Sequence, residues 1–524
     1  MQPRLWQPPI EPSPLEEAVI KRVRRAKLFV FLREQRHEIF NTAFQEELSG
    51  LYRDSKRGQP PIPPAQLALA TLLQAYTGAS DDEVIEATTM DRRWQLVLDC
   101  LDTQEPPFSK GSLIAFRNRL MEMNMDRRLI ERTIEVANKT AGFGARPLRA
   151  ALDSSPLWGA SRVEDTYNLL GHALRKALGV IARQQGRELT EIAREANAVV
   201  VAGSSLKAAL DRDWDDAAQC EQALGLVLAA LTAVERWLET APEGHDTPVV
   251  AFSMRAARLV KEQDVQVSEQ GSATLRTGVA KDRRISIEDS QMRHGRKSRS
   301  VRVDGYKRHV LQDLDSGLVR AVGITAANAA EASVTDAIRA DLACQQVHVS
   351  ELHIDRAYLS STWVRERPAD LDISCKTWPV RNGPRFPKTA FHLDWEQQTL
   401  RCPNQQEMPF TPGGVVHFPA EICAACPLRE RCTTSPHGRS VSIHPDEQLL
   451  CELRHRQLTP TGRAKLRERV AVEHTLAHIG HWQGRRARYR GSRKNLFDLR
   501  RSAVVHNLHI IARLIAQTQH SQAA

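Results

Sequence analysis

Residues 305–325 read Gly-Tyr-Lys-Arg-His-Val-Leu-Gln-Asp-Leu-Asp-Ser-Gly-Leu-Val-Arg-Ala-Val-Gly-Ile-Thr, two alternating runs of polar and apolar residues separated by a turn sequence. Alternation of this kind predicts β-strands, and Asp315-Ser316-Gly317 is typical of a turn between antiparallel strands. A helix is expected next, over about 329–343, followed by a short strand that leads to Asp355. The order of these elements predicts an α/β fold.

Two acidic residues, Asp153 and Asp355, each follow a short apolar run. Such a run, bounded by small or polar residues, predicts a buried strand that presents the acid at its end. A third acid, Glu473, lies in the sequence Arg-Val-Ala-Val-Glu-His-Thr (469–475), which predicts a helix. Two strand acids and one helix acid can together hold two divalent cations. Such a pair activates an attacking oxygen and stabilises a leaving oxygen in phosphodiester chemistry.

The composition favours a polyanionic partner. The chain has 524 residues, enough for two or three domains, and 41% of them are hydrophobic, enough to form cores. Its net charge is +10, and Lys and Arg side chains that neutralise phosphates release counterions from nucleic acid. No window approaches the roughly 18–20 apolar residues needed to span a bilayer, and the N-terminus has no secretory signal pattern. We therefore expect a cytoplasmic protein.

Four of the nine cysteines form a second chemical group, in a segment poor in long apolar runs: Cys402, Cys423, Cys426 and Cys432. Thiolates at such spacing suit tetrahedral Zn²⁺, and the alternative is a set of ordinary buried thiols. Four thiolates leave no open position for a water molecule, so the expected zinc is structural and not catalytic. A disulfide framework is not expected of a cytoplasmic chain.

The N-terminal part of the chain predicts a helical region. Residues 1–64 are Pro-rich and then charged, and their last part, 54–64, predicts a stiff linker. A helix is expected over about 65–77, broken by Gly78, and a second one capped by Ser80.

A further helix is expected after Ser109, in the sequence Ser-Lys-Gly-Ser-Leu-Ile-Ala-Phe-Arg-Asn-Arg-Leu (109–120). It sets Arg117 and Arg119 beside apolar positions, as the recognition helix of a helix-turn-helix would. The alternative is a packed helical bundle with solvated arginines.

The central part of the chain predicts a helical insertion over about 165–262, with helical apolar spacing in residues 223–238. The basic run Arg-His-Gly-Arg-Lys-Ser-Arg (293–299) lies just before the predicted hairpin. It is either a solvated loop or, with Arg296, Lys297 and Lys307, a grip on the phosphates beside a cleaved bond.

Five further sequences surround these acids: Glu-Asp-Thr-Tyr-Asn-Leu-Leu (164–170), Met-Arg-His-Gly-Arg-Lys-Ser (292–298), Asp-Gly-Tyr-Lys-Arg-His (304–309), Thr-Ala-Ala-Asn-Ala-Ala-Glu-Ala (325–332) and Gly-Arg-Arg-Ala-Arg-Tyr-Arg-Gly (484–491). With them the chain resembles a DDE transposase of a bacterial insertion sequence, over about residues 60 to 512. The resemblance implies a ribonuclease H-like catalytic core, with a helical insertion and a small Cys-rich insertion, preceded by an all-helical N-terminal domain. In such a core Asp153 and Asp355 would lie on neighbouring strands.

The resemblance also implies a function. Such an enzyme binds the ends of its element, hydrolyses a phosphodiester to free a 3′-OH, and joins that hydroxyl to target DNA. Asp153, Asp355 and Glu473 would be catalytic and would hold two Mg²⁺ or Mn²⁺ ions. A homodimer and a location at the bacterial nucleoid are expected. The alternative is a domesticated or inactive relative that binds DNA without cutting it.

The expected domains follow from these patterns and from the resemblance. They are an N-terminal segment with linker at 1–64, a helical DNA-binding domain at 65–145, a catalytic domain at 146–512 and a C-terminal tail at 513–524. The catalytic domain would contain a helical and basic insertion at 165–290 and an insertion with the cysteines at 360–460.

The third acid departs from a signature that related enzymes often carry, Tyr-x2-Arg-x3-Glu-x6-Lys. Arg469 and Glu473 fit it, and Arg469 is expected to contact DNA, whereas Leu466 and Gly480 occupy the positions of its Tyr and Lys. The DNA contacts of that Tyr and Lys therefore do not carry over. Arg485, Arg486 or Lys494 are the candidates to supply the positive charge instead.

A metalloprotease is the alternative for the histidines near Glu473. His474 and His478 are four residues apart, as zinc-binding histidines on one helix can be. The order is wrong for it, because Glu473 precedes the first histidine and Val470 stands where the inverted motif needs its leading histidine.

Overall fold

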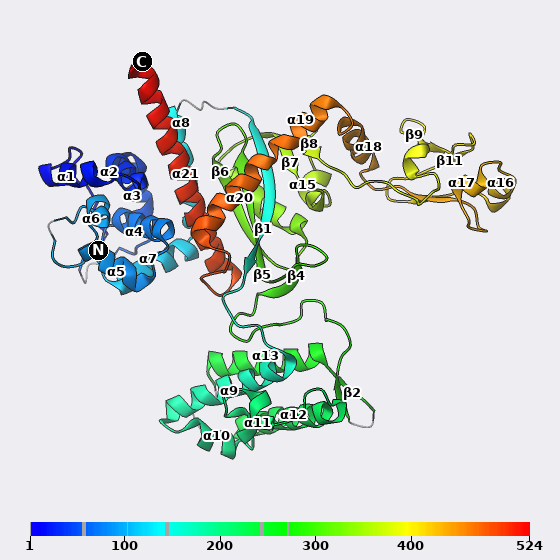
Figure 1. Ribbon diagram of the computed structural model, residues 1–524. Helices are drawn as coiled ribbons and strands as arrows, with labels where there is room; N and C mark the ends of the chain where they lie inside the picture. Colours follow the sequence, from blue (N-terminus) through cyan, green and yellow to red (C-terminus); the bar gives the residue numbers. More distant parts are fainter. Residues whose placement is uncertain are drawn as a thin grey trace.

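A six-stranded mixed sheet lies at the centre of the molecule, with three helical or Cys-containing modules around it (Figure 1). The structure, a computed structural model, describes residues 2–54, 59–101, 103–141, 146–240, 246–269 and 272–523. The strands of the sheet are β1 (Leu148–Trp158), β4 (Arg293–Arg296), β5 (Arg302–Asp313), β6 (Val319–Ala326), β7 (Val349–Ile354) and β8 (Asp372–Cys375).

The strand order is β4-β5-β1-β7-β8, and β6 pairs with β5. Strand β1 is antiparallel to β5 and parallel to β7, and β7 is parallel to β8. The predicted hairpin over 305–325 is confirmed, because β5 and β6 pair antiparallel and Gly317 takes a positive φ of 77° in the turn between them. The helix expected over about 329–343 is present as α14 (Thr335–Cys344), after a 3₁₀ turn at Glu331–Val334.

Alternate residues of β1 face two different cores, as the period of a strand requires. Ala150 and Leu152 pack with α14 and α15 (Thr362–Arg365) in one core. Ala151 packs on the other side of the sheet against α20 (Val470–Gln483) and α21 (Ser492–Ala523). Asp153, two residues after Ala151, therefore faces α20.

Eight helices form the N-terminal module: α1 (Pro14–Arg22), α2 (Lys27–Ile39), α3 (Thr42–Ser49), α4 (Pro64–Thr77), α5 (Asp81–Met90), α6 (Arg92–Leu98), α7 (Lys110–Glu122) and α8 (Asp126–Ala141). The predicted features of α4 and α5 are confirmed: Gly78 ends α4 with a φ of 77°, and Ser80 forms a capping box with Glu83.

Two expectations for the ends of the chain differ from the structure. The region predicted as a Pro-rich and charged segment contains α1–α3, because Phe29, Leu32 and Phe44 are buried against α4 and its neighbours. Residues 55–58 of the predicted linker and the expected boundary at 145 lie outside the described residues. The predicted C-terminal tail continues α21, which runs to Ala523.

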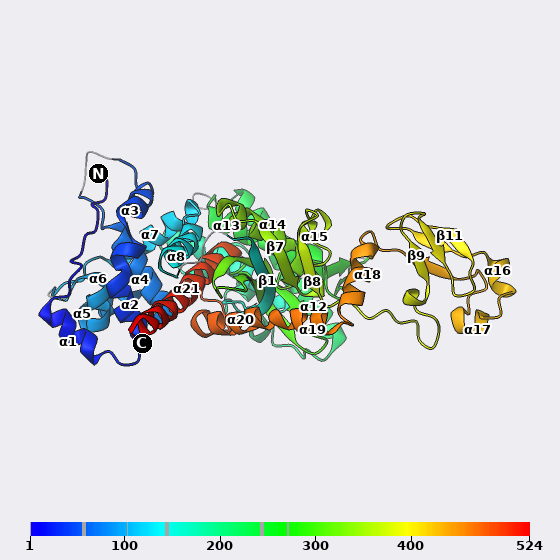
Figure 2. The same cartoon turned by 90° about the horizontal axis from the view of Figure 1, so that it is seen from above.

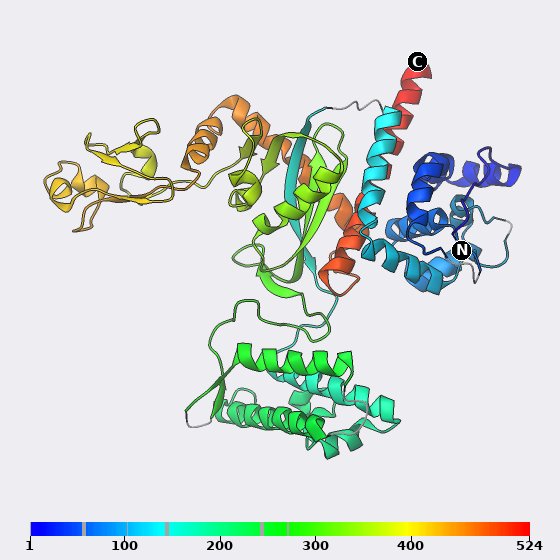
Figure 3. The ribbon, with the colours of Figure 1, turned by 180° about the vertical axis from the view of Figure 1, so that it is seen from behind.

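The N-terminal module and the C-terminal helices share one hydrophobic core. Buried residues of α2, α4, α7 and α8 belong to the same cluster as Val472 of α20 and Val505 of α21. Helix α21 crosses from the sheet to the N-terminal module, which Figure 3 shows from behind. The N-terminal module therefore does not form a separate domain that a linker joins to the central sheet.

The predicted helical stretch over about 165–262 is confirmed as a module with its own core. Its elements are α9 (Thr166–Gln185), α10 (Leu189–Glu195), a 3₁₀ turn (Val199–Val201), α11 (Leu206–Leu210), α12 (Ala217–Thr240), α13 (Pro248–Asp264) and the small hairpin β2 (Val265–Val267) and β3 (Ala273–Leu275). Among the described residues, α12 is long and apolar enough by length and composition to cross a membrane, which differs from the expectation that no window approaches this. Core helices of other proteins pass the same test, and α12 packs against α9 here.

The Cys-containing segment forms an arm that extends from the sheet on the side opposite the N-terminal module (Figure 2). It contains a 3₁₀ turn (Lys388–Ala390), β9 (His392–Asp394), β10 (Thr399–Arg401), β11 (Glu407–Pro409), β12 (Val415–His417), α16 (Ala420–Ala424), α17 (Arg429–Cys432) and β13 (Ser440–Ser442). The chain returns to the sheet through α18 (Glu447–Arg456) and α19 (Pro460–Glu468), which leads directly into α20.

Candidate active site

Asp153 and Asp355 lie on neighbouring strands, as the sequence predicted. The last paired residues of the parallel strands β1 and β7 are Leu152 and Ile354. Asp153 directly follows Leu152, and Asp355 directly follows Ile354. Asp355 ends β7 as expected and caps the 3₁₀ turn Arg356–Tyr358. Asp153 does not end its strand, because β1 continues to pair with β5 as far as Trp158. The acid therefore projects from the middle of a long strand, which fixes its backbone on both sides.

Glu473 lies in the first turn of α20, the helix that packs across β1 and β5. Together with Asp153 and Asp355 it lines one cavity of about 900 Å³. Three acids that are 202 and 118 residues apart in the chain thus meet at one opening, where the ends of two parallel strands meet the start of a helix.

Arg469 joins two of these acids. Its Nη1 donates to Asp153 Oδ2 and its Nη2 to Glu473 Oε1, both at 2.6 Å. Burial raises the pKa of Asp153 above its ordinary value, although Arg469 acts in the opposite direction. Asp355 instead accepts a bond from the backbone N–H of Arg356 at 2.7 Å. A buried carboxylate beside other carboxylates, all of them oxygen donors, fits a site for hard divalent cations such as Mg²⁺.

Positive side chains surround the acids. The cavity is lined by six Lys and Arg residues against four carboxylates, the fourth being Glu331: Arg296, Lys297, Lys307, Arg308, Arg469 and Arg485. Five of them were predicted from the sequence to contact DNA, and Arg308 was not. Lys307 is partly engaged, because its Nζ donates to Ala329 O at 2.9 Å and lies 3.6 Å from a Glu331 carboxylate oxygen.

The remaining predicted DNA contacts lie away from this cavity. Arg486 is exposed, and its guanidinium donates to Gly159 O and Ala160 O. Lys494 is exposed at the start of α21. Arg119 lies over the ring of Tyr52, with its guanidinium carbon 4.6 Å from the ring centre.

Arg117 differs from the sequence-based expectation. It is buried, and both terminal nitrogens donate to the carboxylate of Asp81 at 2.6 Å. Nη1 also donates to Gln74 at 2.8 Å. The guanidinium ties α7 to α4 and α5, so it is not presented to a base edge. At this position the structure agrees with the alternative of a packed helical bundle, except that Arg117 is buried and not solvated.

Residues Asp304–His309 lie on β5 next to the cavity, and their packing and hydrogen bonds stabilise the sheet there. Gly305 has a φ of 153°, and a Cβ there would lie 2.3 Å from Gly159 N, so only glycine fits. The Tyr306 hydroxyl donates to both carboxylate oxygens of Asp289 at 2.7 Å. The sequence places the polar Tyr306 in a regularly alternating strand, and this was the signal that could have predicted its bond to Asp289. The contacts of Gly305 and Tyr306 were not predicted.

His309 is fully buried between two hydroxyl groups. Its Nδ1 bonds to the Tyr358 hydroxyl at 2.8 Å and its Nε2 to Thr325 Oγ1 at 2.9 Å. Burial lowers the pKa of His309 to about 3. Since Tyr358 lies three residues after Asp355, and His309 pairs with Ser154 across the sheet, this neutral imidazole supports the backbone beside both strand acids.

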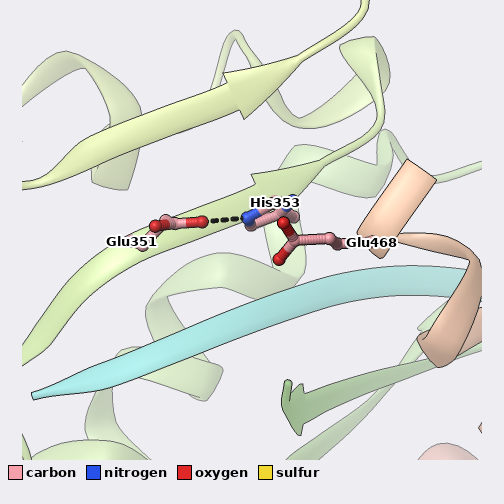
Figure 4. A group of neighbouring side chains, drawn as sticks. All are labelled: Glu351, His353 and Glu468. Atoms are coloured by element: carbon pink, nitrogen blue, oxygen red, sulfur yellow. Dashed lines mark hydrogen bonds and ion pairs between the residues drawn. The ribbon is translucent and has the colours of Figure 1, made fainter. Parts of the chain in front are cut away.

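A second group of ionisable side chains, Glu351 and His353 from β7 and Glu468 from the end of α19, lies close together (Figure 4). Among the described residues, the only group in which three or more candidate metal-ligand atoms lie within 4.8 Å of one another is Glu351, His353 and Glu468. Glu351 bonds to His353 and lies 3.3 Å from Arg149 and 3.2 Å from Lys465, and Glu468 also pairs with Arg149. These contacts lower the pKa of Glu351 to about 2, although burial alone would raise it. The chain's own cations already balance this group, and they tie α19 to β1 and β7 just before α20 begins.

The four predicted zinc ligands Cys402, Cys423, Cys426 and Cys432 line one pocket in the arm. Burial raises the pKa of the Cys432 thiol. The backbone N–H of Leu428 donates to Cys426 Sγ at 3.4 Å. Four sulfur donors around one pocket fit tetrahedral Zn²⁺, although their sulfurs are not gathered as closely as the ligand atoms of the Glu351 group.

Two parts of the chain match known protein families. Residues 19–119 match a family described as a transposase domain (DUF772), and residues 401–512 match a family described as a transposase DDE domain. No curated protein and no solved structure matches the chain.

The two matched ranges contain different parts of the site. The second includes Glu473 and Arg469, whereas Asp153 and Asp355 lie outside both, so their association with Glu473 comes from the sheet geometry. The first begins at residue 19 and so includes α2 and α3, earlier in the chain than the expected resemblance. The chain is therefore similar to transposase domains in two ranges, and the second of these, a DDE domain, contains Glu473, which lines one cavity with Asp153 and Asp355.

Proposed function

We propose that the protein is a transposase that binds the ends of its own element, hydrolyses a phosphodiester to free a 3′-OH, and joins that hydroxyl to target DNA. One observation carries the proposal: Asp153, Asp355 and Glu473 reach one cavity from two adjacent strands and a helix, and cationic side chains line the walls. The strand order, with an antiparallel hairpin on one side of β1 and parallel strands on the other, supports a ribonuclease H-like core.

Asp153, Asp355 and Glu473 would hold the two divalent cations. When bound, these supply a Lewis acid for the attacking and the leaving oxygen of an in-line displacement. The nucleophile is water in the first step and the freed 3′-OH in the second, so the protein forms no covalent bond to DNA.

The protein's own residues then have two tasks. Arg469 holds the carboxylates of Asp153 and Glu473 toward each other, which pre-arranges the ligand set across the interface of α20 with β1. Arg296, Lys297 and Arg485 are exposed cations at the cavity and would neutralise backbone phosphates of the bound strand.

The arm and the N-terminal module have supporting roles in this proposal. Zn²⁺ bound by the four cysteines would stabilise the arm, which has one small hydrophobic cluster of seven buried residues. The exposed surface of the N-terminal module would contribute to recognition of the element ends. Synapsis of two ends predicts a homodimer, and DNA as the partner predicts action at the nucleoid in the cytoplasm.

A DNA-binding protein without cleavage activity is the second candidate. The intact trio of acids and the open cavity favour the enzyme, because a protein that only binds DNA has no need of three carboxylates facing a polyanion.

The test is a cleavage assay. Labelled duplexes that carry the terminal inverted repeats flanking the gene are incubated with the purified protein and Mg²⁺ or Mn²⁺. We expect cleavage at the repeat ends that a chelator abolishes, and joining of the 3′-OH product to plasmid DNA. End binding without cleavage under either metal would support the second candidate. Neither binding nor cleavage would overturn both.

A further inference from the structure

Arg308 is a buried arginine on β5 whose side chain lines the cavity of the three acids. Its Nε donates to Ser155 Oγ at 2.8 Å, and its Nη1 donates to Gln483 Oε1 and to Gly484 O, both at 3.0 Å. Its Nη2 donates no hydrogen bond to the part of the chain that the structure describes. Two nitrogens thus fix the guanidinium, and the third is free to bind a ligand.

Arg308 also stands apart from the other buried arginines by its charge balance. Eight arginines are buried among the described residues, and six of these have a carboxylate within 4.0 Å. The six are Arg33, Arg36, Arg117, Arg132, Arg500 and Arg501.

The two exceptions are Arg284 and Arg308. Arg284 lies over the ring of Phe252, with its guanidinium carbon 5.0 Å from the ring centre, and donates to two backbone carbonyls. Arg308 has no such ring partner among the described residues and faces a cavity. A buried cation is costly without a counter-charge, so an anion is expected to enter where Arg308 is exposed to the cavity.

Gly480 on α20 leaves space for the Arg308 guanidinium. A Cβ at Gly480 would lie 3.2 Å from Arg308 Nη2, tighter than most such contacts. Any larger side chain at this position of α20 would displace the guanidinium or cover its free nitrogen. The helix therefore leaves room for a cation that reaches the cavity from β5.

We infer that Arg308 binds a backbone phosphate of the DNA strand that enters the acid cavity, next to the phosphate that is cleaved. This inference rests on the proposed function. Arg308 pairs with Ser155, which lies two residues beyond Asp153 on β1, a distance of roughly 6.8 Å along a strand. That spacing is too long for contact with the phosphate held at Asp153 and matches the next phosphate along the strand.

The charge of the group agrees with this role. Burial lowers the pKa of Arg308 to about 10, and Asp498 acts weakly in the opposite direction. The guanidinium therefore remains charged at neutral pH, and a phosphate would supply a directly bonded counter-charge, which no carboxylate of the described residues provides within 4.0 Å.

The test removes the charge of Arg308 and that of individual phosphates in turn. Binding of the inverted-repeat duplex is measured in chelator, with each phosphate near the cleavage point replaced singly by an uncharged methylphosphonate. We expect wild-type protein to lose about tenfold in affinity when the phosphate next to the cleaved one is neutral. Arg308→Met should lose about tenfold on unmodified DNA and nothing further at that phosphate, while it stays sensitive at the others.

Arg284→Met is the matched control, because it removes a buried arginine that also lacks a carboxylate partner but does not line the cavity. It should behave as the wild-type protein. On a mixed-sequence duplex, Arg308→Met should also reduce the slope of log affinity against log salt by about one, and Arg284→Met should not.

The outcomes separate this inference from the proposed function. If wild-type protein cleaves DNA but Arg308→Met keeps the full methylphosphonate pattern, Arg308 is a structural residue and the inference is wrong. If wild-type protein neither binds nor cleaves the repeat, the proposed function fails first. Should Arg308→Met not fold by circular dichroism, Arg308→Gln, which retains polar bonding to Ser155, takes its place with the same expected pattern.

Discussion

One face of β1 and β7 carries two groups of carboxylates that differ in how their charge is balanced. Glu351 and His353 alternate along β7, and Asp355 directly follows the strand in the same alternation. Around Glu351, Arg149 and Lys465 pair directly with the carboxylates of Glu351 and Glu468. Around Asp355, the cations line a cavity instead, and no Lys or Arg among the described residues lies within 4.0 Å of its carboxylate.

The difference shows which property marks a site for a bound ion. The Glu351 group is the tighter cluster, yet its ligands are already occupied by the chain's own cations. In the acid cavity Arg469 bridges Asp153 and Glu473, whereas the carboxylate of Asp355 has no Lys or Arg partner within 4.0 Å among the described residues. Crowding of acids alone therefore does not identify a metal site; the state of their partners does.

The largest effect is expected from the acids of the cavity. Asp153→Asn, Asp355→Asn and Glu473→Gln should each lower the cleavage rate roughly a thousandfold or more, because each removes a ligand charge. Binding of element ends should change by less than about threefold, since the surrounding cations remain. Cleavage is measured on labelled ends with Mg²⁺ or Mn²⁺.

Glu331→Gln is the control for these three variants. Glu331 lines the same cavity but approaches Lys307 and not the other acids, so its replacement should leave cleavage nearly intact. A variant of the trio that retains near-normal cleavage would remove that residue from the site.

The cysteine arm provides a third kind of cluster, for which a structural ion is expected. Purified protein should contain about one zinc per chain, and Cys423→Ser with Cys426→Ser should lose it and unfold the arm while the central sheet remains folded. Elemental analysis and limited proteolysis measure this. Cys344→Ser, an exposed cysteine outside the arm, is the control. Freshly reduced wild-type protein without zinc would contradict the prediction.

A smaller effect is expected from the balanced cluster. Glu351→Gln should lower the free energy of unfolding by about 1–3 kcal/mol, since it leaves Lys465 and Arg149 partly unpaired. The pKa of Glu351 is held at about 2, so its stabilisation is present above the ordinary pKa of 4.5 and is lost as the pH falls through 2. The variant should therefore lose part of this acid dependence in chemical denaturation curves.

Cleavage by Glu351→Gln should fall by about tenfold, because α19 no longer positions α20 and its Glu473 as firmly. Its dependence on metal concentration should stay as in the wild-type protein. If instead cleavage by this variant requires much more metal, Glu351 is itself a ligand and the contrast between the two clusters is wrong.

The smallest expected effect is an increase, not a decrease, in the free energy of unfolding. Burial raises the pKa of Asp153, so the ionised form costs stability in metal-free protein, and the stability is greatest at low pH and falls as the pH rises through the folded pKa. Asp153→Asn should therefore raise the free energy of unfolding by up to about 1 kcal/mol at neutral pH in chelator. The two proteins should become equally stable below the ordinary pKa of 3.8. A destabilised Asp153→Asn would mean that the ion pair with Arg469 outweighs the cost of burial.

The sequence predicted those parts of the molecule that depend on neighbouring residues. The hairpin at 305–325 and the end of α4 at Gly78 follow from local periodicity and turn residues. The adjacency of Asp153 and Asp355 was expected from the resemblance to a ribonuclease H-like core. Periodicity does not show how far a strand continues to find a partner, so the position of Asp153 inside β1 was missed.

Features that depend on distant partners were not predictable. Arg117 has the spacing of an exposed base-reading residue, but Asp81 on another helix buries it. Arg308 lies within a noted motif, yet its free nitrogen and the space beside Gly480 arise only when β5 and α20 meet. The sequence shows the chemical identity of a side chain, but it does not show which distant residue that side chain contacts in the fold.

The core shared by the N-terminal module and α21 has a consequence for the order of assembly during synthesis. Val505 and Ile511 complete a cluster that begins with Leu28 and Phe29, so the first helices to be translated lack part of their packing until α21 has left the ribosome. We therefore expect a nascent chain that ends before α21 to expose this apolar surface and to depend on chaperones. Such a chain would have neither a closed N-terminal module nor the packing of α20, which carries Glu473, against α21.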